Sequence, residues 1–103
     1  MKITPDFALE RLKKTDQLFT ELFKHGTLSL EVYKPIQVDN QKSHDRDEIY
    51  VVISGSGKFY CGDEHYAFEK GDFLFVPAGV EHRFEEFSDD FSTWVIFYGP
   101  VGG

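Results

Sequence analysis

Two histidines and one glutamate are the residues of this sequence whose types and spacing point to chemistry. His44 and Glu48 stand four positions apart, just before an apolar run, and His82 follows the Pro77-Ala78-Gly79 turn. Four residues of extended chain would separate the backbones of His44 and Glu48 by roughly 13 Å. Ligands of one metal ion lie about 2.0 to 2.2 Å from it, so the chain must bend between these two residues. The polar residues Asp45–Asp47 tolerate such a corner.

The chemistry of this set is that of a divalent metal. Two imidazoles and one carboxylate with open positions are typical of non-haem Fe(II), and Mn, Ni or Zn occupy similar sites. We therefore predict a metal ion held by His44, Glu48 and His82, with water or Gln41 in a remaining position. The alternative is a metal-free cluster in which the same side chains hydrogen-bond to one another or to a ligand.

The elements that position these residues follow from the apolar spacing. Thr4, Pro5 and Asp6 form a helix start, which predicts a first helix from Pro5 to about Lys14. Leu18–Phe23 predicts a second short helix that ends at Gly26. From Thr27 the period changes to two, and turn residues separate seven predicted strands: Thr27–Tyr33, Glu48–Ile53, Lys58–Cys61, His65–Phe68, Phe73–Val76, His82–Phe84 and Phe91–Tyr98.

Short strands at this density after a helical prelude indicate an all-β antiparallel sandwich or barrel. We predict a helical segment over residues 1–26 that packs on the barrel, a barrel over residues 27–99 and a flexible tail over residues 100–103. The strand Glu48–Ile53 is apolar on both faces, so the N-terminal helices or a second subunit must cover one of them. A homodimer is the prediction that follows.

The complete spacing pattern resembles the two motifs of the cupin family. His44, three residues, Glu48, six residues and Gly55 match the first motif. The second is matched by Gly71, five residues, Pro77-Ala78-Gly79, two residues and His82. The resemblance implies a small single-domain cupin, an all-β jelly roll or double-stranded β-helix with a short N-terminal helical segment.

The resemblance also implies a function class. His44, Glu48 and His82 match the second His, the Glu and the last His of the cupin metal set, whereas Lys42 stands where the first His is found. We expect a metal-dependent small-molecule enzyme of the oxygenase or isomerase type. Lys42 would then anchor an anionic substrate or act in acid-base catalysis, or it is a solvated loop lysine. The alternatives are a non-catalytic cupin that binds or senses a small metabolite and a structural dimer module.

Further side chains are candidates for the substrate pocket. Gln41 lies next to the first motif, and several aromatic residues on the predicted strands could point inward: Tyr50, Phe75, Phe84, Trp94 and Phe97.

Composition excludes some partners. The formal net charge is -7, so nucleic acid and anionic membrane are poor partners for this surface. The single cysteine, Cys61, cannot form an intramolecular disulfide, and the N-terminus lacks the apolar run of a signal peptide. We expect a cytoplasmic protein that binds a small molecule.

Overall fold

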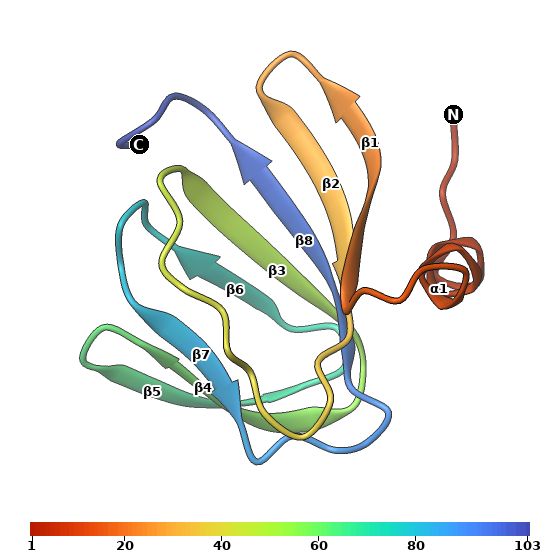
Figure 1. Cartoon of the computed structure of the whole chain (residues 1–103). Helices are drawn as coiled ribbons and strands as arrows, with labels where there is room; N and C mark the ends of the chain where they lie inside the picture. Colours follow the sequence, from red (N-terminus) through yellow and green to blue (C-terminus); the bar gives the residue numbers. More distant parts are fainter.

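The computed structural model describes residues 1–103, and its strands form two antiparallel sheets that face one another (Figure 1). A five-stranded sheet has the order β1-β2-β8-β3-β6, and a three-stranded sheet has the order β5-β4-β7. The chain begins with helix α1, Pro5–Lys13. The strands are β1 Phe19–His25, β2 Leu28–Tyr33, β3 Asp47–Ser54, β4 Ser56–Cys61, β5 Glu64–Glu69, β6 Phe73–Val76, β7 His82–Glu85 and β8 Ser92–Tyr98.

All seven strands predicted from the sequence are present, with boundaries that differ by at most two residues. Between β3 and β4 the chain passes from the large sheet to the small one at Gly55, whose φ is +87°. A Cβ at this position would lie 2.6 Å from the Cα of Phe91, so only glycine fits the crossing. The conformational freedom of Gly55 thus allows β3 and β4 to face each other across the interior.

The predicted second helix is wrong, because Phe19–His25 forms strand β1. Its apolar residues recur at an interval that fits a helix, but β1 pairs with β2 along its whole length, and the hydrogen-bonded hairpin overrides that local pattern. Gly26, expected to end a helix, has φ +58° and is the first residue of the two-residue hairpin turn. Of the helical segment expected over residues 1–26, only α1 is helical.

The first helix is confirmed. Thr4 caps it, since its Oγ1 accepts a hydrogen bond from the backbone N–H of Phe7 at 3.1 Å. Ala8 and Leu12 are buried against Val32 on the outer face of the large sheet, and Trp94 packs at the same place. Figure 1 shows α1 beside this sheet, on the side away from the small one. Neither α1 nor any other part of the chain forms a helix long and apolar enough to span a bilayer.

The interior between the sheets is filled with aromatic rings at one end. Phe84 lies at the centre of this aromatic core, with its ring centroid 4.7 to 5.3 Å from four others. These neighbours are Tyr50, Phe59, Phe68 and Phe91, and all are buried. Rings packed in tilted and edge-to-face pairs leave no room for water, so this end is dry.

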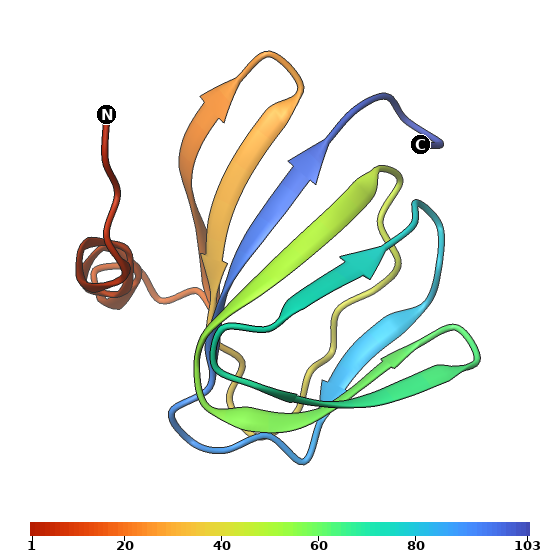
Figure 2. The same ribbon diagram turned by 180° about the vertical axis from the view of Figure 1, so that it is seen from behind.

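The outer face of the large sheet is apolar beyond the area that α1 covers. Ile49 pairs with Phe75 on one side and with Ile96 on the other, and Val51 pairs with Phe73. Phe73 remains 62% exposed and Phe75 43% exposed. The back view in Figure 2 shows β3 and β6 side by side at the edge of the sheet that lies away from the helix.

Candidate metal centre

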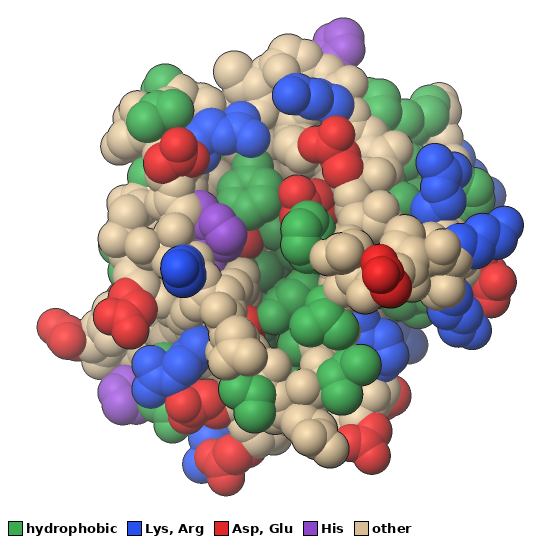
Figure 3. Space-filling model, in the orientation of Figure 1, with side chains coloured by type: hydrophobic (Ala, Val, Ile, Leu, Met, Phe, Trp, Pro, Cys, Tyr) green, Lys and Arg blue, Asp and Glu red, His purple; other side chains and the backbone are tan.

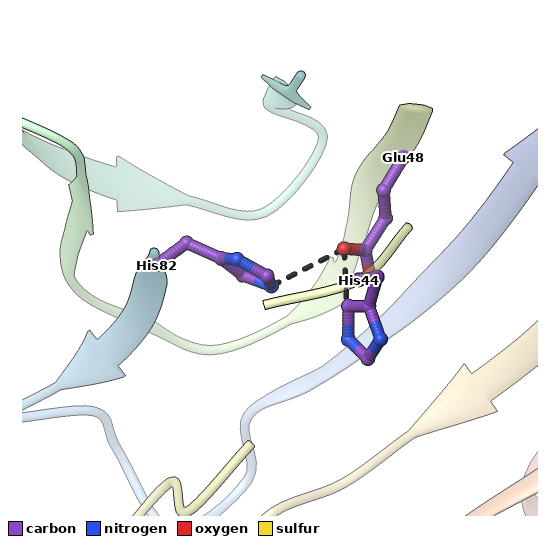
Figure 4. A group of neighbouring side chains, drawn as sticks. All are labelled: His44, Glu48 and His82. Carbon is purple, nitrogen blue, oxygen red and sulfur yellow. Dashed lines mark ion pairs between the residues drawn. The ribbon is translucent and has the colours of Figure 1, made fainter. Parts of the chain in front are cut away.

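His44, Glu48 and His82 come from three different parts of the fold and meet at one point (Figure 4). Glu48 is the second residue of β3 in the large sheet, and His82 is the first residue of β7 in the small sheet. His44 lies in the loop before β3, where the chain bends at Asp45 and Arg46. The bend that the sequence requires is therefore present.

The distances between the side chains are close to those of a metal site. His82 Nε2 lies 3.2 Å from Glu48 Oε1, and His44 Nε2 lies 3.9 Å from the same oxygen. All three ligand atoms lie within 4.8 Å of one another. Two atoms bound at about 2.1 Å to one ion are at most about 4.2 Å apart, so a small inward rotation of the half-buried His44 completes the set.

The tautomer of His82 is fixed by its backbone neighbour. Its Nδ1 lies 2.9 Å from the carbonyl oxygen of Val80, and since a carbonyl only accepts, Nδ1 carries the hydrogen. In the neutral ring Nε2 then directs a lone pair at the oxygen of Glu48. Two lone pairs at 3.2 Å repel each other, so a proton or a metal cation belongs between them.

The burial of Glu48 and His82 increases the need for a cation between them. Glu48 is 1% exposed and His82 2% exposed, and both carboxylate oxygens and His82 Nε2 are buried without a hydrogen bond. The 3.2 Å contact has the length of an ion pair without the geometry of a hydrogen bond. An uncompensated buried carboxylate is strongly unfavourable. The unsatisfied atoms are those that a divalent ion would bind, so the residues fit a metal.

The contact with Glu48 also affects the pKa of His82. Burial lowers the pKa of its imidazole, but the Glu48 carboxylate and the Val80 carbonyl outweigh this effect and raise the pKa above its usual value. A metal ion that binds His82 Nε2 therefore has to compete with a proton.

The Pro77-Ala78-Gly79 turn holds the loop that carries His44. The N–H of Gly79 donates to the His44 carbonyl at 2.6 Å, and the N–H of Ala78 donates to Asp47 Oδ1 at 2.9 Å. The second motif therefore contributes His82 and also ties the first motif in place.

Gln41 is placed beside the candidate ligands by a buried carboxylate. Asp39 accepts hydrogen bonds from the backbone and side chain of Gln41, from Tyr33 Oη at 2.6 Å and from the N–H of Phe84 at 2.9 Å. The amide oxygen of Gln41 then accepts from Tyr50 Oη at 3.0 Å and lies 3.4 Å from His44 Nε2. Sequence reasoning missed Asp39, because an isolated polar residue in a loop gives no periodic signal.

The other predicted site residues have different positions. Tyr50 lies near the centre, with its ring centroid 6.1 Å from that of His82, and Phe97 stacks edge-on with His44 at 5.0 Å. Phe84 lies within the aromatic core. Lys42 is exposed and forms no hydrogen bond or ion pair within the chain. The structure does not bring Phe75 and Trp94 to the centre, because alternation along β6 and β8 directs them to the outer face of the large sheet.

A cavity of about 270 Å³ adjoins the centre. In Figure 3 the middle of the visible face is hollowed, with a histidine at its border and acidic side chains within it. The side chains that line the cavity come from β1, β2, β3, β8 and the loop before β3: Phe19, Glu31, Tyr33, Gln41, His44, Glu48, Val95 and Phe97.

Four of these lining residues escaped the sequence analysis: Phe19, Glu31, Tyr33 and Val95. Phe19 was expected in a helix. Glu31 and Tyr33 alternate with the apolar residues of β2, a pattern that normally places the polar side toward water. Here the polar side faces the interior. A glutamate in the middle of a strand of otherwise apolar and small residues was the one signal that could have identified this face.

Burial and neighbouring charges shift the pKa of two cavity groups. Burial, followed by the charges of Glu21 and Glu48, raises the pKa of Glu31 to about 7, against a small opposing effect of Arg46. Burial and the Asp39 carboxylate raise the pKa of the Tyr33 phenol. Both shifts have the same cause, the partial burial of these groups beside carboxylates.

The chain belongs to the cupin domain family, whose family model matches residues 29–97, more than half of the chain. The crystal structure of a cupin 2 conserved barrel domain protein from Salinispora arenicola superposes with a TM-score of 0.72 at 18% identity, and the match covers 96% of this chain and 89% of that one. The all-β cupin fold with a short N-terminal helix is thus confirmed.

Two relatives in sequence are informative. An uncharacterised protein of Streptomyces coelicolor is 40% identical over 100 residues, which cover 91% of this chain and 95% of that protein. An acireductone dioxygenase of Citrobacter koseri is 37% identical over 68 residues, 61% of this chain. The second match spans 38% of the length of the dioxygenase, so the similarity concerns only a part of that protein.

Proposed function

We propose that this protein is a metal-dependent small-molecule enzyme, and within that class an oxygenase that uses Fe(II). The observation that carries the proposal is the group of buried, unsatisfied ligand atoms on Glu48 and His82, with His44 beside them. The sequence similarity to a part of an acireductone dioxygenase favours oxygenase over isomerase chemistry. Manganese, nickel and zinc fit the same donor atoms.

In this proposal His44, Glu48 and His82 hold the metal, and the amide oxygen of Gln41 is available as a further ligand. A bound Fe(II) ion supplies the site where dioxygen and substrate meet. The chain provides the remaining functions. The Val80 carbonyl fixes the tautomer of His82, Asp39 positions Gln41, and the aromatic walls limit the access of water.

Elemental analysis of protein purified without a histidine tag tests this proposal. We expect close to one metal per chain after anaerobic loading with Fe(II), and a near-complete loss in His82→Ala and Glu48→Ala. His65→Ala is the matched control, because His65 is exposed in the β4–β5 hairpin, away from the centre. Wild-type protein that stays free of metal under these conditions would refute the proposal.

A non-catalytic cupin that binds or senses a metabolite is the second candidate. The exposed position of Lys42, where the family pattern has its first histidine, favours it, because only two imidazoles remain for the metal. Consumption of dioxygen or of a substrate by the Fe(II)-loaded protein, abolished in His82→Ala, would exclude it. Binding without turnover would favour it over the enzyme.

We also propose a homodimer through the outer face of the large sheet. The exposure of Phe73 and Phe75 next to the half-buried Ile49, Val51 and Ile96 supports it, since a monomer rarely leaves such a row of apolar side chains open to water. Light scattering during gel filtration should show a dimer that Phe73→Glu converts to a monomer. The control Val101→Glu changes an equally exposed apolar residue in the C-terminal turn and should leave the dimer intact.

A further inference from the structure

The cavity beside the metal centre has an unusual balance of side chains. Besides the candidate ligands it is lined by three aromatic rings, Phe19, Tyr33 and Phe97, and by the carboxyl group of Glu31. No lysine or arginine lines it. A negatively charged ligand would therefore be repelled by Glu31 and could find a partner only at a bound metal ion.

Glu31 has no hydrogen-bond or ion-pair partner in the chain, although it is half-buried. The hydroxyl group of Ser29, its neighbour on the same face of β2, donates to Glu21 at 2.8 Å instead. Arg46, whose positive charge acts on Glu31, donates to the carbonyl of Thr27 and forms no ion pair with Glu31. A half-buried carboxyl group without a protein partner is unfavourable for stability, and it is available to a ligand.

The fold leaves this carboxyl group free for a ligand. Glu31 lies on the central part of β2, opposite Val95 of β8, and Glu48 lies one strand further, opposite Phe97. One molecule of modest size in a 270 Å³ cavity can thus reach both the metal centre and Glu31. Aromatic faces together with an anionic group attract organic cations, because the ring quadrupole and the carboxylate act in the same direction.

We infer that the cavity binds a small organic cation, a molecule whose protonated amine lies against Glu31 and the rings of Phe19, Tyr33 and Phe97. This inference depends on the proposed function in one respect: the bound molecule would be the substrate of the metal centre. Glu31 selects the substrate by charge. The aromatic rings contribute to the affinity, and Gln41 and Tyr33 stay engaged with Asp39.

Three probes of the same size and different charge test this inference: benzylamine, benzyl alcohol and benzoate. Binding is measured by calorimetry at about pH 8 in the presence of a chelator, so that the result does not depend on metal. Above its pKa of about 7 the carboxyl group of Glu31 is ionised. We expect benzylamine to bind about tenfold more tightly than benzyl alcohol, and benzoate to bind most weakly.

Two variants that each remove one negative charge show which carboxyl group causes the preference for the amine. Glu31→Gln should bring the affinity for benzylamine to that for benzyl alcohol, whereas Glu69→Gln, at an exposed position on β5, should keep the tenfold preference. Benzoate binding as tightly as benzylamine, or a preference that survives in Glu31→Gln, would overturn the inference. Metal content is measured separately, so a protein that prefers the amine but holds no metal would refute the proposed enzyme and leave the binding site standing.

Discussion

The two ends of the interior differ in what their side chains do for the protein. At one end Phe84 and its ring neighbours pack closely, and the one hydroxyl among these rings, that of Tyr50, donates to Gln41. At the other end Glu31, Glu48 and His82 are wholly or partly buried with too few partners, around a cavity. The rings of the aromatic core come from both sheets, whereas the strand residues that line the cavity all belong to the large sheet. The first end stabilises the fold by burying apolar surface, and the second leaves polar groups unsatisfied, which costs stability and is the pattern expected of a ligand site.

The largest effect is expected at the aromatic end. Phe84→Ala removes a buried ring that contacts four others and leaves a cavity, so the free energy of unfolding should fall by about 3 to 5 kcal/mol. Urea denaturation measures the change. Phe7→Ala, at a half-exposed position on α1, should cost less than about 1 kcal/mol. Equal losses in the two variants would contradict the assignment of the core.

A substitution at the metal centre should not lower the free energy of unfolding. In the presence of a chelator, Glu48→Gln replaces the buried carboxylate by a neutral amide of the same shape that can donate to Nε2 of a neutral His82, so the unfolding free energy should stay unchanged or rise by about 1 to 2 kcal/mol. The same variant should lose the increase in melting temperature that divalent metal gives the wild type. Thermal melts with chelator and with Fe(II) or Zn(II) test both parts. A variant that is still stabilised by metal would show that Glu48 is not a ligand.

Glu31 should make stability depend on pH. Its pKa is raised from 4.5 to about 7 on folding, so between these values the folded state binds more protons than the unfolded state. The contribution of Glu31 to stability is therefore greatest below about pH 4.5 and is lost as the pH rises through about 7. Glu31→Gln abolishes this loss and should stabilise the chelator-treated protein at about pH 8 by about 1 to 2 kcal/mol, a figure reduced for partial solvent screening.

Glu69→Gln provides the comparison for that measurement, because Glu69 is exposed and should change stability by less than about 0.5 kcal/mol at any pH. A Glu31→Gln protein whose stability follows the wild-type pH profile would mean that Glu31 is well hydrated. The polar end of the interior would then be open to water.

The smallest effect is expected at Lys42. Because this side chain is exposed and has no partner, Lys42→Met should change stability by less than about 0.5 kcal/mol and leave the metal content as it was. Elemental analysis and thermal melts check both values. A change in metal content would place Lys42 nearer to the centre than the structure does, and would support the catalytic role considered for it.

Much of this fold follows from local patterns. The turns at Gly55, Gly62 and Pro77–Gly79 separate the strands correctly, and the cap at Thr4 starts α1. Residues 19–25 were the exception, because short apolar runs fit a helix and a strand equally well. Only the hairpin with β2, stabilised by contacts outside the segment, decides between the two.

The spacing of His44, Glu48 and His82 within the two motifs was enough to predict the candidate ligands. The N–H groups of Ala78 and Gly79 hold the loop that carries His44. The tertiary structure decided which face of each strand is interior. A period of two shows that the two faces of β2 differ but does not show which one meets the opposite sheet. Because α1 packs on the apolar face of β2, the opposite face, with Glu31 and Tyr33, is turned toward the cavity.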